Sequence, residues 1–359
     1  MSEPAWPRSV LIARSAFDVQ YEPALNRALN ELGVSSRIVE THQYIGGGLL
    51  GRLQERVLWG PGLAKASREL LRGVREEKPD VVLFYQGHHY SRPTVAAARA
   101  HAFIAGIHND DPFGPRRKLL RYRLLLKALP LYHGYHVYRD CNVPELQAWG
   151  VPRVKVLMSF YVPWLDFPRD LDQREMQRWG CELAFAGHPE PDMRTECIAR
   201  TVRAGIAVKL YGPERFWRKW LPPDVFRRLA PLRKVFGEDY RKALCGAKMV
   251  ACFLSKWNRD QYTRRAFEIP ACGAFLLAER TPLMRQLYEE GREAEYFDSP
   301  EEFLDKVRFY RDHDQARRKV AQAGCRRATT SPYDVYSRMR QWLGDVSQWR
   351  REMTAGAAP

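Results

Sequence analysis

The sequence predicts an α/β protein made of two successive Rossmann-like domains, each a doubly wound parallel sheet covered by helices. Apolar runs of strand length alternate with segments whose apolar residues recur at helical spacing, and this series starts again after an irregular stretch at 159–180. The length of 359 residues, 45% of them hydrophobic, allows two domains of ordinary size.

The first half of the chain opens with a β-α-β unit. An apolar strand leads into a helical pattern, and Gly33 separates that helix from the next strand. The run Val81–Tyr85 is apolar throughout, as expected for a parallel strand that is covered on both faces. Strands are predicted at 9–13, 36–40, 81–85, 102–107, 136–138 and 155–157, and helices at 21–32 and 63–77.

The second half follows a stretch with two prolines and mixed charges, from Ser159 to Gly180, which predicts a linker and a short helix. We therefore place two domains at 1–165 and 166–330, with a helical tail at 331–359. Ser299-Pro300-Glu301-Glu302 has the capping residue, first-turn proline and acidic residues of a helix start. Strands are predicted at 182–186, 207–211, 248–254 and 275–278.

Composition indicates the cellular compartment of the protein and the class of partner that it binds. The longest apolar runs are far shorter than the roughly 20 residues of a membrane-spanning helix, and the N-terminus lacks the pattern of a signal peptide. We expect a cytoplasmic protein. Its seven cysteines form no Cys-x-x-Cys pair, so we expect reduced, packing thiols. A net charge of +16 favours anionic partners: nucleic acid, an anionic membrane surface or phosphorylated ligands.

The most specific pattern lies between Asp239 and Arg280. It contains Tyr240-x-x-Ala-Leu, then Asn258-Arg259-Asp260, then Arg265-Ala-Phe-Glu268, then Ala271-Cys-Gly-Ala-Phe-Leu-Leu. In order and spacing this stretch resembles the CgeB-like (spore-maturation type) glycosyltransferases. Ala184-Phe-Ala-Gly187 and Leu210-Tyr-Gly212 fit the same resemblance, which covers most of the second half and only loosely the first.

The resemblance implies the GT-B fold, in which two Rossmann-like domains face each other across a cleft and the last helix crosses back to the first domain. Residues 1–165 would then hold the acceptor and residues 166–330 the nucleotide-sugar donor, with Pro332–Trp349 as the returning helix. It also implies a hexosyltransferase-like reaction that uses no metal and no cofactor besides the donor.

Retaining GT-B enzymes, which the family resembles, carry two glutamates separated by seven residues, the second of which binds the nucleotide ribose. Glu268 occupies the second place and Asp260 the first, where the shorter aspartate reaches the donor sugar differently. An ionised carboxylate also offers two acceptor oxygens to the two neighbouring hydroxyls of a ribose. The alternative for Glu268 is an acidic residue favoured by a helix start.

Positive groups and backbone amides are needed where charge grows on the leaving diphosphate. We expect Arg264, Arg265, Gly187 and the neighbouring His188 and Arg194 to serve there, and Val235-Phe236 to edge the base. A solvated arginine, a loop histidine and apolar loop packing are the alternatives for Arg194, His188 and the Val-Phe pair. The donor site is completed by Gly212, Asn258 and Arg259, which the resemblance implies.

In the first half, His108-Asn-Asp110-Asp111-Pro follows a strand, at the sheet edge where α/β proteins bind ligands. Related retaining enzymes often carry a histidine here that contacts the donor sugar, so His108 and Asp110 join Asp260 as catalytic candidates; capping and turn roles are the alternative. The two-domain pattern argues against a GT-A metal motif at the paired aspartates. Gln86-Gly-His88-His89 follows another strand and is a candidate for the acceptor side.

Two segments are rich in both basic and apolar residues, at 116–127 and 215–236. Both suit an anionic lipid surface, which a lipid-linked acceptor would require, but an ordinary solvated surface over buried residues is the alternative.

The function expected from these observations is transfer of a sugar from a nucleotide diphosphate sugar to a cell-envelope or other glycan acceptor, with no nucleic acid involved. A noncatalytic protein that binds polyanions or membranes is a rival, and a GT-B epimerase or phosphorylase is another.

Overall fold

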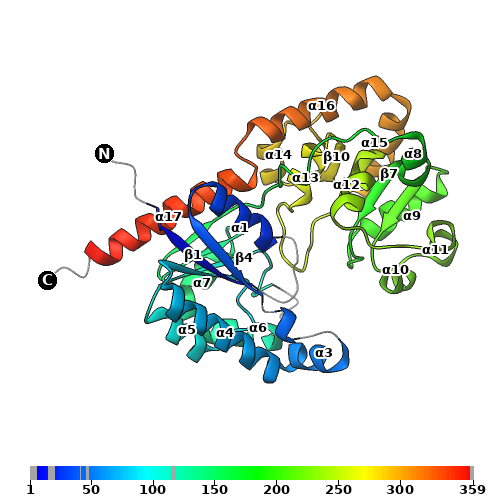
Figure 1. The fold of residues 1–359 in the computed structure, drawn as a ribbon. Helices are drawn as coiled ribbons and strands as arrows, with labels where there is room; N and C mark the ends of the chain where they lie inside the picture. The colour runs from blue at the N-terminus through cyan, green and yellow to red at the C-terminus, as the bar shows by residue number, and fades with distance from the viewer. Residues whose placement is uncertain (1–5, 15–20, 41, 46–47, 115–118, 356–359) are drawn as a thin grey trace. The chain divides into compact units, whose positions relative to one another are not determined.

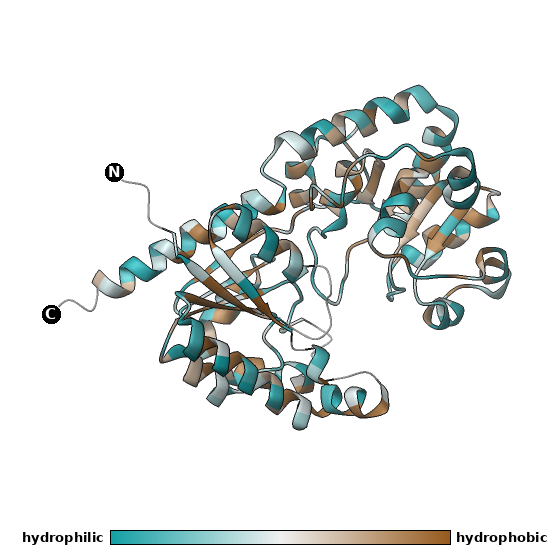
Figure 2. Cartoon of the chain, in the orientation of Figure 1, coloured by the Kyte–Doolittle hydropathy of each residue, from teal (hydrophilic) through white to brown (hydrophobic). Residues whose placement is uncertain are grey.

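The structure, a computed structural model, describes residues 6–14, 21–40, 42–45, 48–114 and 119–355 (Figure 1). These residues form two compact α/β units. Unit 1 comprises the described residues up to Ser159 together with those from Val335 onwards, and unit 2 is Phe160–Asp334. In both units the central strands are the most hydrophobic segments, drawn largely brown in Figure 2, and the helices that cover them are mixed.

Unit 1 contains a six-stranded sheet in the order β2-β1-β3-β4-β5-β6, and every neighbouring pair is parallel. The chain starts in the middle of the sheet, adds β2 on one side and then crosses to β3 on the other. Its strands are β1 Ser9–Ala13, β2 Ser35–Val39, β3 Val81–Tyr85, β4 Phe103–His108, β5 Gly134–Val137 and β6 Val154–Val156. Its helices before the domain boundary are α1 Tyr21–Glu31, α2 His42–Ile45, α3 Gly48–Val57, α4 Pro61–Glu77, α5 Arg92–Arg99, α6 Leu119–Ala128 and α7 Asn142–Ala148, with a 3-10 turn at Leu129–Leu131.

The last helix, α17 (Val335–Ala355), belongs to unit 1, although 175 residues of unit 2 separate it from the rest of that unit. Its Asp345 binds Lys155 at 2.6 Å and His136 at 3.0 Å, and its Arg350 binds Asp80 at 2.8 Å. Trp349 packs so closely on Gly134 that a Cβ there would lie 2.2 Å from the indole ring. The predicted return of the last helix is therefore confirmed.

Unit 2 contains a five-stranded parallel sheet in the order β11-β10-β9-β7-β8. Its strands are β7 Cys181–Ala186, β8 Val208–Tyr211, β9 Ala247–Cys252, β10 Phe275–Glu279 and β11 Glu295–Phe297. Its helices are α8 Gln173–Trp179, α9 Arg194–Arg203, α10 Glu214–Trp220, α11 Pro223–Leu229, α12 Gly237–Cys245, α13 Arg265–Ala271, α14 Pro282–Leu287, α15 Pro300–Asp312 and α16 Asp314–Thr330.

The two parallel sheets confirm the predicted fold class, and the predicted strands lie within one or two residues of the observed ones. β11 was not predicted, because a three-residue edge strand has too few residues to display a period. The stretch after Ser159, which was predicted to be a linker with a short helix, packs against unit 2. Phe160, Val162 and Asp166 are buried there before the short helix α8 begins.

All seven cysteines are free thiols, and Cys197, Cys252 and Cys272 are buried in unit 2. Within the described residues, no helix combines the length and the apolar character needed to cross a bilayer.

Candidate functional site

The sheet of unit 2 reverses its strand order between β7 and β9, because the chain runs from β7 to β8 on one side and returns to β9 on the other. Ligands of open parallel sheets bind beyond the carboxyl ends of the strands at such a switch point. Gly187 and His188 follow β7, and the loop of residues 255–264 follows β9 and leads into α13. Most of the predicted donor residues therefore come together at this edge.

Two glycines let the ends of β7 and β8 approach closely. A Cβ on Gly212 would lie 2.2 Å from the carbonyl oxygen of Gly187 and 2.6 Å from Nε1 of Trp217. A Cβ on Gly187 would lie 2.7 Å from Cζ of Phe185 and 3.4 Å from Nη2 of Arg265. Both positions need glycine for space, and Gly187 leaves its backbone open beside the Arg265 guanidinium.

Glu268 lies in the first turn of α13, and its carboxylate is buried. Its side chain is only 8% exposed. Oε1 lies 2.6 Å from Nε of Arg264, and Oε2 accepts a hydrogen bond of 3.0 Å from the hydroxyl of Tyr240 in α12. The carboxylate is thus oriented from two elements, and each of its oxygens retains a second lone pair.

Asp166 is a site residue that sequence reasoning missed. Its Oδ2 accepts a hydrogen bond of 2.7 Å from the backbone N–H of Val162 and lies 3.9 Å from Nη2 of Arg264. Burial, reinforced by the negative charge of Glu268, raises the pKa of Asp166 to about 7. One arginine therefore stands between two buried carboxyl groups.

Arg265 begins α13 and lies over the ring of Phe185, with its guanidinium carbon 5.9 Å from the ring centroid. Partial burial lowers the pKa of the neighbouring His188, and the positive charges of Arg265, Lys234 and Arg194 lower it further. The neutral form of this ring is favoured, so the cations near it are Arg265, Arg194 and Lys234.

Arg194 is buried, and its guanidinium is committed to protein groups. It binds the carboxylate of Asp192 through Nε at 2.8 Å and Nη2 at 2.6 Å, and Nη1 donates to the carbonyl oxygen of His188 at 2.8 Å. It shapes the loop that follows β7, so the solvated-arginine alternative is wrong for this residue.

The loop after β9 carries Asn258, Arg259 and Asp260 and is organised around Ser255. The backbone N–H of Asn258 donates to Oγ of Ser255 at 3.2 Å, and the backbone N–H of Asp260 donates to the carbonyl oxygen of Ser255 at 2.9 Å. In return, the Ser255 N–H donates to Oδ2 of Asp260 at 3.3 Å. Arg259 adopts a φ of 50°, in the left-handed region. The predicted polar cluster is therefore a compact turn beside the switch point.

Val235 and Phe236 precede α12. Val235 is buried, whereas Phe236 is 65% exposed. Apolar packing therefore explains Val235, and the ring of Phe236 remains available to a ligand.

His108 ends β4 of unit 1 and is buried. Its Nδ1 lies 2.9 Å from the carbonyl oxygen and 3.1 Å from the backbone nitrogen of Asp110, while Nε2 has no hydrogen-bond partner among the described residues. Burial lowers the pKa of His108 to about 4, so the ring is neutral near pH 7. Asp111 accepts hydrogen bonds from the Phe113 N–H and from Asn142, both at 2.9 Å, which is a turn role.

A second buried histidine, His88, lies near His108, and sequence reasoning did not predict this proximity. Gln86 and Gly87 have φ angles of 61° and 67°, and this tight turn after β3 is followed by the buried residues His88 and His89. The ring of Tyr122 lies 6.2 Å from that of His88 and 5.4 Å from that of His108. The sequence could have indicated this proximity in part, because His88 follows β3 and His108 ends β4, and these neighbouring parallel strands end at the same edge of the sheet.

Comparison with known proteins shows what this chain is similar to. Residues 194–344 match the model of a glycosyl transferase-like family. No curated protein sequence matches the chain. The solved structure of HepE from Anabaena, in complex with UDP and glucose, has a TM-score of 0.63 at 12% identity, covering 95% of this chain and 100% of that chain. Sucrose-phosphate synthase from Thermosynechococcus elongatus has a TM-score of 0.64 at 12% identity, covering 97% and 99%.

The chain has the GT-B fold. A putative UDP-N-acetylglucosamine 2-epimerase from Listeria monocytogenes is also similar, with a TM-score of 0.58 at 13% identity over 97% of this chain and 98% of that one. Within this GT-B chain, the residues that match the family model contain the catalytic candidate Asp260 and most of the predicted donor-binding residues: Arg194, Gly212, Val235, Phe236, Asn258, Arg259, Arg264, Arg265 and Glu268.

The two basic segments of this GT-B chain differ in what they expose. Residues 116–118 of the first lie outside the described residues, and the rest forms α6, where Tyr122, Leu125 and Leu126 are buried. The second spans α10 and α11, where Trp217, Val225 and Phe226 are buried, while Phe216 and Trp220 are about two-fifths exposed.

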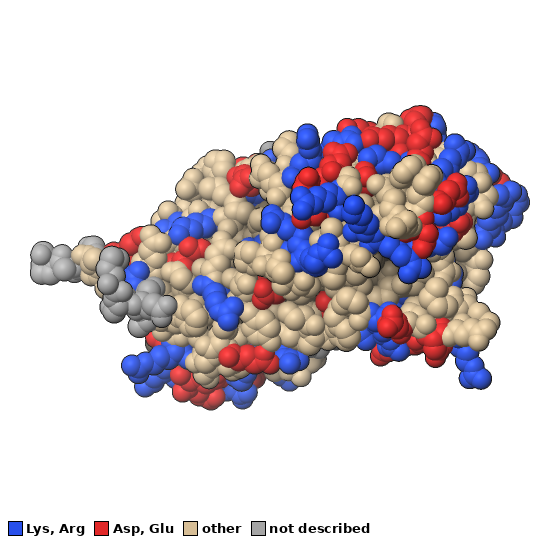
Figure 3. All heavy atoms as spheres, turned by 90° about the horizontal axis from the view of Figure 1, so that it is seen from above, with Lys and Arg blue, Asp and Glu red and all other residues tan. Residues whose placement is uncertain are grey.

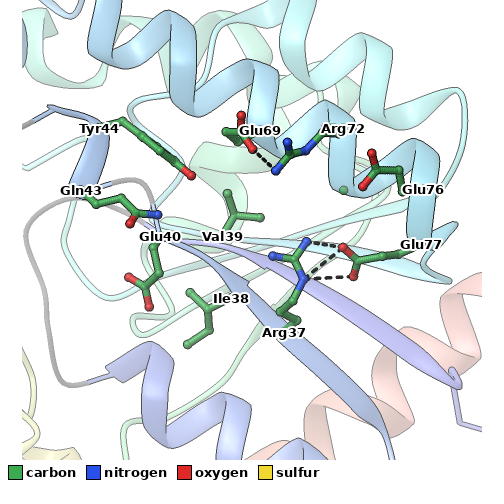
Figure 4. Close-up of a pocket in the computed structure, with 11 residues that line it drawn as sticks. Arg37, Ile38, Val39, Glu40, Gln43, Tyr44, Glu69, Arg72, Glu76 and Glu77 are labelled. Atoms are coloured by element: carbon green, nitrogen blue, oxygen red, sulfur yellow. Dashed lines mark hydrogen bonds and ion pairs between the residues drawn. The ribbon is translucent and has the colours of Figure 1, made fainter.

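A hollow of about 360 Å³ lies beside edge strand β2 (Figure 4). Its charged groups pair with one another, Arg37 with Glu77 and Arg72 with Glu69. It lies at the edge of the sheet rather than at the β1/β3 switch point, and we assign it no ligand. Across residues 6–14, 21–40, 42–45, 48–114 and 119–355, no group of three or more His, Cys, Asp or Glu side chains is arranged to hold a metal ion.

Proposed function

We propose that this protein is a CgeB-like glycosyltransferase of the cytoplasm. It moves a hexose-like sugar from a nucleotide diphosphate sugar to a glycan acceptor of the cell envelope, without a metal. The observation that carries the proposal is the position of Arg265 beside Gly187 at the switch point of unit 2, with Glu268 in the first turn of the same helix. Arg265 and Glu268 lie inside the segment that matches the glycosyl transferase-like family. UDP binding by the similar HepE structure supports the choice of donor class.

Glu268 holds the ribose in this proposal. Arg264 and Tyr240 fix the carboxylate from one side, and the remaining lone pair on each oxygen accepts one ribose hydroxyl. Because the carboxylate is oriented before the ligand arrives, little further ordering is needed on binding. The exposed ring of Phe236 is the side chain we assign to the face of the base.

In this proposal Arg265 binds the diphosphate. In the transfer, the bond between the sugar's anomeric carbon and the diphosphate oxygen breaks, and a bond to the acceptor hydroxyl oxygen forms. The hydroxyl proton passes to the departing diphosphate. Negative charge grows on the leaving phosphate, where a guanidinium that is already in place stabilises the transition state more than the ground state. Gly187 places no side chain beside this guanidinium, where a Cβ would lie 3.4 Å from Nη2.

His108 and Asp110 of unit 1 are our candidates for contact with the donor sugar. The neutral His108 ring has an Nε2 atom that no described group occupies, so it is able to exchange a hydrogen bond with a sugar hydroxyl. Asp260 takes the place of the first of the paired glutamates, and we infer that the reaction retains the anomeric configuration. An NMR spectrum of the product anomer tests this inference.

The test of function is to incubate the protein with each nucleotide sugar, with and without glycan acceptors, in the presence of EDTA. Acceptor-dependent release of the nucleoside diphosphate supports the proposal. Interconversion of the donor sugar without an acceptor would instead support an epimerase, the class named for the similar Listeria structure.

The noncatalytic polyanion-binding rival is less well supported, despite the charge of +16. Basic and acidic side chains are interspersed on the face seen in Figure 3, and many pair within helices, as Arg200 does with Glu196 and Arg318 with Asp314. Charge that is paired in this way makes this face a poor site for a polyanion.

A further inference from the structure

Helix α3 turns its apolar side outward. Leu49, Leu50 and Leu53 are 84%, 75% and 54% exposed, and Val57 is 37% exposed. At about 100° per residue these four positions share an arc of roughly 100° on one side of the helix. The only residue of α3 that is buried is Gly51, on the opposite side. In a helix that merely covers a domain, the apolar arc would face the core.

The turn that follows α3 extends the same surface. Trp59 is 77% exposed, and its backbone N–H donates to the carbonyl oxygen of Gln54 at 3.3 Å. The Gln54 side chain accepts a hydrogen bond of 2.8 Å from the N–H of Gly62, which ties the turn to α4. Leu58 adopts a φ of 47°, a left-handed conformation that is unfavourable for leucine, and is buried while its neighbour Trp59 is exposed. The backbone conformation of the turn therefore keeps the Trp59 indole exposed.

Helix α6 adds a further apolar residue from a distant part of the sequence. Leu120 is 70% exposed, and α6 packs beside α3, where Arg123 donates a hydrogen bond to the carbonyl oxygen of Val57. We call the set Leu49, Leu50, Leu53, Val57, Trp59 and Leu120 the α3–α6 surface. Figure 2 shows brown segments along α3. Exposed apolar residues gathered in one place mark interaction sites more often than single ones do.

Charge indicates what the α3–α6 surface contacts. Arg52 and Arg56 are exposed beside the apolar arc. The single acidic residue between 48 and 68 is Glu55, which lies on the side of the helix opposite the leucines. Burial raises the pKa of Glu55, and the positive charge of Arg121 in α6 opposes that rise. No acidic residue occurs in α6. The surface is thus apolar with a basic rim.

We propose that the α3–α6 surface of unit 1 docks on an anionic lipid membrane, with its leucines and Trp59 entering the interface and its arginines contacting lipid phosphates. An amphipathic helix lying in the interface has this combination of leucine, tryptophan and arginine, and tryptophan favours the headgroup level. This inference does not depend on the proposed transferase activity, because it concerns only where unit 1 sits.

Cosedimentation of the full chain with vesicles tests the proposal. Wild-type protein is expected to pellet with vesicles of phosphatidylglycerol and phosphatidylcholine and to remain mostly in the supernatant with phosphatidylcholine alone. L49S/L53S is expected to reduce the partition by about tenfold or more, because the removed apolar groups supply much of the binding. R52Q/R56Q is expected to weaken binding to the anionic vesicles only.

The matched control is M176S/F309S, which removes two apolar side chains that are 45% and 48% exposed in unit 2. It should bind vesicles as wild type does. Equal vesicle binding by L49S/L53S and wild type would overturn the proposal, as would the absence of binding to anionic vesicles. Sedimentation velocity adds an independent outcome: a wild-type dimer that L49S/L53S converts to a monomer, without vesicle binding, would assign the surface to a second copy of the chain.

Discussion

Nε of Arg264 lies 2.6 Å from Oε1 of Glu268, one helical turn away, and each side chain is only 8% exposed. Removing one partner of a buried ion pair usually costs more than the pair contributes, because it leaves a charge buried without compensation. The pair therefore couples the proposed ribose ligand to the stability of unit 2. A variant at either residue must be tested for folding and for binding separately.

Glu268→Gln should weaken binding of the nucleoside diphosphate by about tenfold or more, because a neutral amide accepts hydrogen bonds from the ribose less strongly than a carboxylate does. It should also lower the melting temperature, since Arg264 loses its ionic partner. Isothermal titration below the melting temperature measures the first effect and differential scanning calorimetry the second.

The matched control is Glu295→Gln. Glu295 is also buried, pairs with Lys306 and accepts a hydrogen bond from the hydroxyl of Tyr310. This variant should lose stability to a similar degree and keep full affinity for the nucleotide. If both variants lost affinity equally, the effect of Glu268 would be structural, and its role as a ribose ligand would be refuted.

Arg265→Gln should distinguish the diphosphate from the rest of the nucleotide. A charge-assisted hydrogen bond contributes about 1.5–3 kcal/mol, so affinity for the nucleoside diphosphate should fall by roughly 10- to 100-fold. Affinity for the corresponding nucleoside should not change. Equal losses for both ligands would show that Arg265 acts elsewhere.

The two glycines at the switch point should respond differently to alanine. Gly212→Ala brings a methyl group within 2.2 Å of the Gly187 carbonyl oxygen, so overpacking should destabilise unit 2 by about 1–3 kcal/mol. Gly187→Ala brings the methyl group within 2.7 Å of Cζ of Phe185, a side-chain rather than a backbone atom, so it should cost less stability. It should cost more nucleotide affinity, since the methyl group lies beside Arg265. Thermal unfolding and titration of both variants check this contrast; the opposite order would count against a ligand at Gly187.

Asp166 should make stability depend on pH. Its pKa is raised from 3.8 to about 7 in the folded protein, so between these values the folded state binds more protons than the unfolded state. The stabilisation is complete below about pH 4 and is lost as the pH rises through about 7. The asparagine of Asp166→Asn does not ionise. As the pH rises from about 4 to above about 7, the free energy of unfolding should therefore fall by a few kcal/mol less in this variant than in wild type.

Urea unfolding at pH 4.5 and at pH 8, values chosen to lie roughly inside and above the titration window, measures this difference. Asp140→Asn, at an exposed aspartate of unit 1, serves as the control and should follow the wild-type curve. Parallel curves for Asp166→Asn and wild type would contradict the assignment of the titration to Asp166.

Much of the fold follows from the sequence because hydrophobic periodicity is a local signal. The strand Val81–Tyr85 was predicted with its exact bounds, since five consecutive apolar residues between polar ones allow no other strand. Gly187, Arg265 and Glu268 were placed at one site by the resemblance and by the rule that ligands bind beyond the carboxyl ends of parallel strands. The capped helix at Ser299 was also predicted, and Ser299 accepts a hydrogen bond from the Glu302 N–H.

The remaining features depend on contacts between residues distant in sequence. Nothing near Glu268 in the sequence indicates that Tyr240, 28 residues earlier, donates to it, or that Asp166 shares its arginine. Arg194 was expected to meet a phosphate, but the nearby Asp192 binds it. The outward-facing leucines of α3 were missed because periodicity identifies an apolar side of a helix without saying which way that side faces.

The account's central claim is that a nucleoside diphosphate binds at Glu268 and Arg265. A thermal-shift comparison of wild type, Glu268→Gln and Glu295→Gln against UDP, GDP, dTDP, ADP and CMP, with magnesium and with EDTA, tests it most directly. The account predicts that one nucleoside diphosphate raises the melting temperature of wild type and Glu295→Gln equally with and without magnesium, and raises that of Glu268→Gln much less. No shift with any nucleotide, or the same shift in all three proteins, would contradict it.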